Sequence, residues 1–253
     1  MRLFQPQVFQ VAPSIWCVRR VSYLTCSYIV KTAAGIVLVD AGMDSGGHDM
    51  RYALEKLKLP AEEVRAVLLT HWHNDHAAGG QALHEQLGAA IYYHAADAPF
   101  LTRATARRGL RGWLSDLIPE WGLFVLFKGL LGEATPEAVA ASAFVSDGEI
   151  LLEDFEVVAT PGHTPGHVSY YYRPERALFA GDALAVVGGR VHFMARPVTP
   201  DVPEARLSMR RLLSLDIANL CPGHRSPLTE NVNALCQEMA QSIDRGDPWP
   251  FLG

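Results

Sequence analysis

Cysteine is scarce in this chain, which has four cysteines in 253 residues and no Cys-x-x-Cys pair. Such pairs are typical of structural zinc sites and of thiol redox motifs, so the sequence predicts neither of these. Buried free thiols are therefore the expected state of the cysteines. A disulfide between Cys17 and Cys26 is the alternative.

A basic excess and a long apolar run are missing as well. The chain has 22 Lys and Arg against 27 Asp and Glu, and this balance argues against nucleic-acid binding. The first residues, MRLFQPQVFQVAPS, do not resemble a secretory signal, so the expected compartment is the cytoplasm. The longest apolar stretch, residues 121–132, contains Lys128 and falls short of the about twenty residues that a membrane span needs.

The chain does have enough apolar residues for a full core, since 49% of it is hydrophobic. Residues 64–70, VRAVLLT, indicate a buried strand, and residues 47–59 and 77–88 on either side show helical spacing of apolar residues. Residues 97–143 have a helical pattern that interrupts this alternation, and strand patterns return from Ser146. We therefore expect one α/β domain over residues 1–253, with a helical insertion at about 97–143.

Metal-type ligands are concentrated in HWHNDH, directly after the predicted strand: His71, His73, Asp75 and His76. Imidazole and carboxylate groups are good ligands for zinc and similar divalent metals. His71 and His73 point the same way if the backbone is extended, whereas Asp75 and His76 lie where the chain turns into a helix. The cluster therefore predicts two adjacent metal positions, each of which still lacks ligands.

Three further residues have a setting suited to complete these positions. His163 in ATPGHTPGH, Asp182 in LFAGDAL and His224 in NLCPGH each follow a glycine in a turn after a predicted strand. Glycine permits the tight backbone paths that converging ligands need. Other histidines lie on predicted helices or at a strand end and are not expected to bind metal: His48, His84 and His94.

The ordered motifs THWHNDHAAG, PGHTPGH, AGD and PGH resemble those of the metallo-β-lactamase-fold hydrolase superfamily, over almost the whole chain outside residues 97–143. The resemblance implies a four-layer αβ/βα sandwich of two mixed sheets flanked by helices. It lies nearer to the glyoxalase II and lactonase branch than to true β-lactamases, which generally lack a carboxylate such as Asp182. Ala185 departs from the Tyr that many lactonases carry there, and the glutathione-binding basic residues of glyoxalase II are not evident.

The resemblance also implies a ligand set and two divalent metal ions. The first metal would be held by His71, His73 and His163. The second metal would be held by Asp75, His76 and His224. Asp182 would bridge both. Zinc is the commonest metal of the family, and iron and manganese also occur, because the same ligand types suit all three.

Three more residues have supporting roles in this interpretation. Asp40 resembles the family's aspartate that holds the second nitrogen of a metal-bound histidine; a turn-forming Asp before glycine is the alternative. His167 is expected to pack beside the site without binding metal. His192 is a candidate substrate contact or proton donor, and a surface histidine is the alternative.

The implied activity is that of a dinuclear metal-dependent hydrolase acting on a small-molecule ester, lactone or thioester. Two cations about 3.5–4 Å apart share a water and lower its pKa, so a metal-bridging hydroxide would attack the substrate. Asp75 is the expected catalytic residue, since it would orient the hydroxide or assist proton transfer. The alternatives are a phosphodiesterase, a non-haem iron redox enzyme and a non-catalytic metal-binding protein of the same fold.

The insertion bears on the substrate and on the oligomer. Its apolar residues are suited to a layer packed on the sandwich, to a lid over the metals, or to a homodimer interface. It also carries four arginines with no acid among them: Arg103, Arg107, Arg108 and Arg111. If these face the metals, an anionic substrate such as a phosphodiester is favoured.

Overall fold

The computed structural model of the chain describes residues 5–21, 23–102 and 138–251. Residues 103–137 hold most of the predicted insertion and all four of its arginines. The expectations of a lid, of a homodimer interface and of an arginine-rich wall therefore lie outside the described residues.

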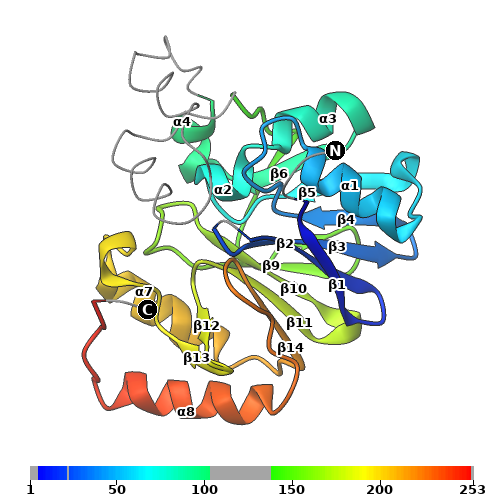
Figure 1. Cartoon of the computed structure of the whole chain (residues 1–253). Coiled ribbons are helices and arrows are strands. Elements are labelled where there is room, and N and C mark those ends of the chain that lie inside the picture. Colours follow the sequence, from blue (N-terminus) through cyan, green and yellow to red (C-terminus); the bar gives the residue numbers. More distant parts are fainter. Residues whose placement is uncertain (1–4, 22, 103–137, 252–253) are drawn as a thin grey trace.

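Two β-sheets lie face to face in the centre of the molecule (Figure 1). The first sheet has seven strands in chain order, antiparallel from β1 to β4 and parallel from β4 to β7. Its strands are β1 (Gln7–Ala12), β2 (Ile15–Arg20), β3 (Thr25–Thr32), β4 (Gly35–Val39), β5 (Val64–Leu68), β6 (Ala90–His94) and β7 (Ala143–Val145).

The second sheet has the strand order β14-β11-β10-β9-β8, in which β14 and β11 are parallel and the other neighbours antiparallel. A separate two-stranded ribbon pairs β12 with β13. These strands are β8 (Ile150–Leu151), β9 (Phe155–Ala159), β10 (Val168–Tyr172), β11 (Ala177–Gly181), β12 (Ala185–Val187), β13 (Arg190–His192) and β14 (Asn219–Pro222). Both sheets are mixed, as predicted.

Helices cover the outer face of each sheet (Figure 1). The covering helices are α1 (His48–Leu57) and α3 (Gly80–Leu87) on the first sheet, and α7 (Val202–Leu212) and α8 (Val232–Asp244) on the second. In α1, the side chains of Met50, Ala53 and Leu54 share one buried face because they are spaced three and four residues apart. The layer order is helix, sheet, sheet, helix, which confirms the predicted four-layer sandwich.

Shorter helices connect these elements: η1 (Ala61–Glu63), α2 (Asn74–Ala77), η2 (Ala95–Asp97), α4 (Ala98–Leu101), η3 (Arg173–Glu175) and η4 (Arg196–Val198). The predicted insertion, at about 97–143, begins helically in η2 and α4, and its last residue overlaps the start of β7. Ala143 already belongs to β7, which pairs with β6. A three-residue edge strand carries too little alternation to be recognised in the sequence. Among the described residues, no helix combines the length and the apolar character needed to cross a membrane.

Buried aromatic residues join the two sheets just below the strand ends. Tyr28 of β3 contacts Phe179 of β11 edge to face at 5.2 Å, and its hydroxyl donates to the Pro222 carbonyl of β14 at 2.7 Å. The Tyr170 hydroxyl of β10 donates to the Leu69 carbonyl at 2.9 Å. Buried phenols need such partners, and here the partners belong to the opposite sheet, since Pro222 ends β14 and Leu69 directly follows β5. These contacts fix the spacing between the sheets beside the predicted metal ligands.

All four cysteines are buried free thiols, as the composition predicts: Cys17, Cys26, Cys221 and Cys236. The alternative of a disulfide between Cys17 and Cys26 is therefore wrong for this structure.

Candidate metal centre

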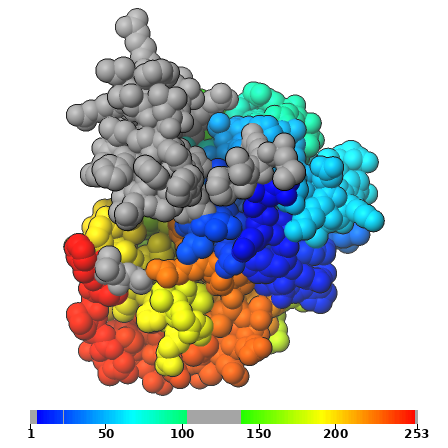
Figure 2. Space-filling view, in the orientation of Figure 1, coloured from blue at the N-terminus to red at the C-terminus, as the bar shows by residue number. Residues whose placement is uncertain are grey.

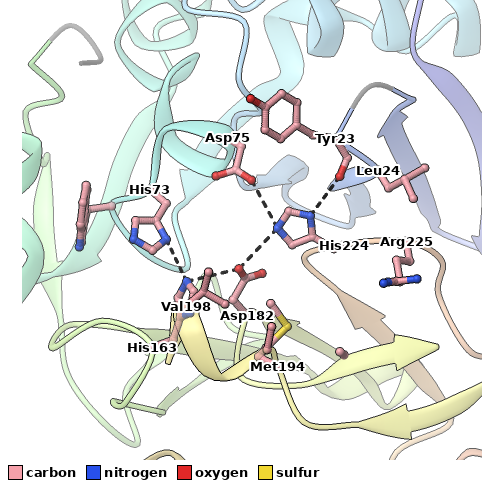
Figure 3. Close-up of a pocket in the computed structure, with 13 residues that line it drawn as sticks. Tyr23, Leu24, His73, Asp75, His163, Asp182, Met194, Val198, His224 and Arg225 are labelled. Atoms are coloured by element: carbon pink, nitrogen blue, oxygen red, sulfur yellow. Dashed lines mark hydrogen bonds and ion pairs between the residues drawn. The ribbon is translucent and has the colours of Figure 1, made fainter. Parts of the chain in front are cut away.

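The predicted ligands come from loops at one edge of the two sheets, each shortly after a strand (Figure 3). His71 follows β5 of the first sheet. From the second sheet, His163 follows β9, Asp182 follows β11 and His224 follows β14. Sites form at such strand ends because the loops there carry side chains that the packed sheets hold in place.

The HWHNDH segment is partly helical. His73 is the residue before α2 and has an extended backbone, whereas Asp75 and His76 lie within α2. This confirms the prediction that Asp75 and His76 lie where the chain turns into a helix, while His71 and His73 lie in the segment between β5 and α2. This change of conformation separates the directions of the two pairs, since an extended stretch and a helical turn aim their side chains differently.

A first group of nitrogens is formed by His71, His73 and His163. The Nδ1 atom of His73 lies 3.1 Å from Nε2 of His71 and 2.9 Å from Nε2 of His163. Burial lowers the pKa of all three imidazoles, well below the usual value for His71 and to about 4 for His73. The group is therefore neutral at pH 7, which is the form that binds a metal.

A second group is formed by Asp75, His76 and His224. The Oδ2 atom of Asp75 lies 3.7 Å from Nε2 of His76 and 3.3 Å from Nε2 of His224. The two Nε2 atoms lie 3.4 Å from each other. His224 is held by the first sheet, because Thr25 forms a β-bridge with it and the Cys26 amide donates to Gly223 O at 2.7 Å. Figure 2 shows the blue N-terminal strands against the orange C-terminal segments.

Asp182 lies between the two groups (Figure 3). Its Oδ2 atom is 3.3 Å from Nε2 of His163 and 3.4 Å from Nε2 of His224, and its Oδ1 atom is 3.6 Å from Nε2 of His76. Oδ1 is buried and has no hydrogen-bond partner among the described residues. A buried carboxylate oxygen without a donor is expensive unless a cation or a proton is close. The position of Asp182 therefore suits a ligand shared by both groups.

The carboxylates of this centre favour positive charge on the atoms around them. Burial opposes a charge on His76, but the carboxylates around it, Asp75 first, outweigh burial and raise its pKa to about 10. Burial acts on His224 in the same way, and Asp182 outweighs it and raises the pKa to about 9. Burial would raise the pKa of Asp182, yet the neighbouring imidazoles hold it well below its usual range. Protons on these histidines balance the carboxylates here, and divalent metals would do the same at the same atoms, so the donor set fits metal ions.

Asp40 orients one histidine of each group. Its carboxylate accepts from the Thr70 amide at 2.8 Å, from the Thr70 hydroxyl at 3.0 Å and from Nδ1 of His76 at 2.8 Å. The Thr70 hydroxyl also lies 3.0 Å from Nδ1 of His71, from which it accepts because its own proton goes to Asp40. Asp40 has φ 59, so it also makes the left-handed turn that was its alternative role. The Thr70 link was not predicted, although its place beside His71 was visible in the sequence.

Asp97 is a further residue that sequence reasoning missed. It is fully buried and accepts hydrogen bonds from the Trp72 amide, the Thr164 hydroxyl and the Gly166 amide. Only its place three residues after β6, at the start of the predicted insertion, hinted at a role. No local pattern shows that its partners belong to two distant loops.

The other histidines mostly take ordinary places. His167 accepts from the Asp182 amide at 3.0 Å through Nε2, and it packs beside the centre as predicted. His192 pairs with Ala185 and is half buried, but it lies beside the pocket rather than in its wall, which Met194 of the same segment lines instead. Hydrogen bonds away from the centre hold the remaining three, as expected for non-ligands: His48, His84 and His94.

A pocket of about 610 Å³ opens over the two groups. Apolar side chains make up most of its remaining wall: Leu24, Trp72, Ala185, Met194 and Val198. Figure 3 shows Met194 and Val198 close to Asp182. Among the described residues of the wall, Arg225 is the single Arg or Lys.

Comparisons with known proteins show the family and the fold of this chain. A profile of the family described as the metallo-beta-lactamase superfamily matches residues 24–224. YflN of Bacillus subtilis, a probable metallo-hydrolase, is 29% identical over 229 residues, which cover 82% of this chain and 82% of that protein. The hydroxyacylglutathione hydrolase GloC of Haemophilus influenzae is 27% identical over 176 residues, covering 66% and 70% of the two chains. The MIM-2 metallo-beta-lactamase shares the fold, with a TM-score of 0.67 at 22% identity over 95% of this chain and 89% of that one.

Proposed function

This chain belongs to the metallo-beta-lactamase superfamily, and we propose that it is a dinuclear metal-dependent hydrolase of a small-molecule ester, lactone or thioester. The observation that carries the proposal is the position of Asp182 between two three-residue groups of metal-type ligands at the floor of a largely apolar pocket. Two adjacent ligand groups that share one carboxylate support a site for two metal ions, as two-metal hydrolysis requires.

The proposed ligands follow the two groups. His71, His73 and His163 would hold one ion, and Asp75, His76 and His224 the other. Asp182 would contact both, and its negative charge would reduce the repulsion between the cations. Two divalent ions held there, zinc in the first instance, would lower the pKa of a shared water toward neutrality and so supply the nucleophile.

Asp75 is the proposed catalytic residue. Its carboxylate is partly exposed and lines the pocket, so it would face both a metal-bound water and a substrate in the pocket. The Thr25 hydroxyl donates to its Oδ2 atom at 3.4 Å, which holds the carboxylate in this direction. A carboxylate so placed orients a water and accepts its proton when the water attacks.

The pocket wall supports an acyl substrate. Apolar side chains beside the ligand groups would bind the carbon chain of an ester or thioester and exclude water from it. The named substrate of the relative GloC, a hydroxyacylglutathione, is a thioester. A phosphodiester has less support, because Arg225 is the single Arg or Lys among the described residues of the wall.

The test is a hydrolysis panel on purified protein of measured metal content. The panel would contain short and long lactones, thioesters and esters, a β-lactam and a phosphodiester. Turnover of acyl substrates with two metals bound is expected. Turnover confined to the phosphodiester would replace the acyl proposal, and an iron-loaded protein without hydrolytic turnover would favour the redox alternative.

A further inference from the structure

The buried carboxylate of Asp97 connects the two loops that carry the first ligand group. Its Oδ2 atom accepts from the Trp72 amide at 3.0 Å and from the Thr164 hydroxyl at 2.9 Å. Its Oδ1 atom accepts from the Gly166 amide at 2.7 Å. Two of these donors are immediate chain neighbours of the ligands, because Trp72 separates His71 from His73 and Thr164 follows His163, and Gly166 lies three residues after His163.

The backbone of Gly166 packs closely against Asp97. A Cβ atom at Gly166 would lie 2.6 Å from the Asp97 amide nitrogen and 2.7 Å from Oδ1, so no larger residue fits there without displacing Asp97. At their base, the loops are also joined by the Val168 amide, which donates to Thr70 O at 2.9 Å. Asp97 adds the connection at the end of the loops where the imidazoles lie.

The second group is positioned by other contacts. Asp40 holds His76 at 2.8 Å. The turn that carries His224 is held by backbone bonds, from Gly223 N to Gly181 O at 2.8 Å and from Cys26 N to Gly223 O at 2.7 Å. None of these contacts involves Asp97. Asp97 therefore contacts only the loops of the first group, whereas Asp40 supports His76 directly and His71 through Thr70.

We propose that Asp97 is a positioning residue that sets the distance between the His71–His73 loop and the His163 loop, and thereby the metal affinity of the first position alone. The inference rests on the proposed dinuclear site. An ionised carboxylate accepts all three bonds. In Asp97→Asn, one oxygen becomes an NH₂ group that must face the Trp72 or the Gly166 amide, so at least one loop loses its bond.

The test measures zinc affinity by competition with a coloured chelator and needs no activity. Asp97→Asn is combined with His224→Ala, which leaves the first position, and separately with His163→Ala, which leaves the second. In the first pair, Asp97→Asn should weaken zinc binding at least about tenfold, the usual cost of losing a residue that orients metal ligands. In the second pair, the change should stay within about twofold. Equal losses in both pairs, or no loss in either, would overturn the proposal.

Two more variants keep the result interpretable. Thr164→Val removes only the hydroxyl bond and should weaken zinc binding at the first position by about fivefold. This variant tests the proposal if Asp97→Asn does not fold. The same effect at both positions would overturn the proposal. Asp49→Asn removes another buried carboxylate, which pairs with Arg20 at 2.8 Å, and should alter neither affinity. Wild-type protein that binds fewer than two zinc ions would refute the dinuclear site itself. If the wild-type protein binds two zinc ions and Asp97→Asn leaves the zinc affinity of the first position unchanged, only the positioning role would be refuted.

Discussion

The Oδ2 atom of Asp40 lies 2.8 Å from Nδ1 of His76, and both side chains are buried. Because a carboxylate only accepts, Nδ1 of His76 carries the proton, and Nε2 is left to face Asp75 and Asp182. The Thr70 hydroxyl donates to Asp40 and accepts from Nδ1 of His71, so Nε2 of His71 is also left to face the ligand group. One carboxylate outside the ligand groups therefore fixes an imidazole in each of them.

Replacement of Asp40 should weaken both metal positions. In Asp40→Ala, His76 and Thr70 lose their acceptor, and we expect a loss of about 10–100-fold in metal affinity, with kcat/KM falling alongside. Chelator competition and kinetics measure the two effects. Asp44→Ala, which removes the 2.9 Å contact to His48, is the control and should behave as wild type in both assays. Unchanged zinc affinity in Asp40→Ala would contradict the orienting role.

Replacement of Asp182 should remove metal and activity together. Asp182→Ala takes away the carboxylate between the groups, so two cations would face each other without a shared negative ligand. Elemental analysis and the hydrolysis panel test this. Asp216→Ala deletes an exposed carboxylate, paired with Arg176 at 2.7 Å, and should change neither. Full activity of Asp182→Ala with two bound metals would rule out the bridging assignment.

The metal-free protein should be most stable near pH 6.5. The pKa values of His76 and His224 are raised to about 10 and about 9, so the stability they contribute is complete below about 6.5 and is lost as the pH rises through those values. The pKa of His73 is lowered to about 4, and those of His71 and His163 are also lowered, so stability falls again as the pH drops below about 6.5.

Urea unfolding of chelator-treated protein between about pH 5 and pH 10 measures this profile. His224→Gln lacks one of the imidazoles with a raised pKa, so its free energy of unfolding should decline less as the pH rises. A free energy of unfolding that stays constant from about pH 7 to pH 10 would show that His76 and His224 do not hold protons in the metal-free protein.

Arg225 should favour substrates with a negative group. Its backbone has a left-handed conformation with φ 74. Its amide N–H donates a hydrogen bond to Leu24 O at 2.6 Å, and its carbonyl accepts one from the Arg19 guanidinium at 2.8 Å. In Arg225→Gln, we expect KM to rise roughly five- to tenfold for a nitrophenyl hemiglutarate, whose acyl chain ends in a carboxylate. We expect KM to stay constant for nitrophenyl butyrate, which is uncharged. Arg190→Gln, on the surface beside Glu238, is the matched control. Equal changes for both esters would exclude charge recognition.

Much of this centre could be predicted from the sequence because its information is local. The HWHNDH spacing, the glycines before His163, Asp182 and His224, and the strands before them are readable within short windows. The α/β alternation is likewise a matter of periodicity. The order of the motifs along the chain then led to the family, which the profile match over residues 24–224 confirms.

Other features could not be predicted, because they depend on contacts between distant segments. His73 and His163 are 90 positions apart, yet their ring nitrogens lie 2.9 Å from each other. Asp97 resembled an ordinary residue at the start of a helical stretch, and His192 resembled a site residue although the pocket wall uses Met194 instead. Neither local charge nor periodicity distinguishes these cases.

The sequence by itself determined which side chains are available as candidate metal ligands, and that the segments that carry them follow strands. The tertiary structure alone decided how they meet. Packing of the two sheets through Tyr28 and Tyr170 brings four strand ends to one edge, where Asp182 lies between both groups. The reason is physical: ligand type and strand period are properties of short segments, whereas convergence depends on burying two apolar faces against each other, which involves the whole chain.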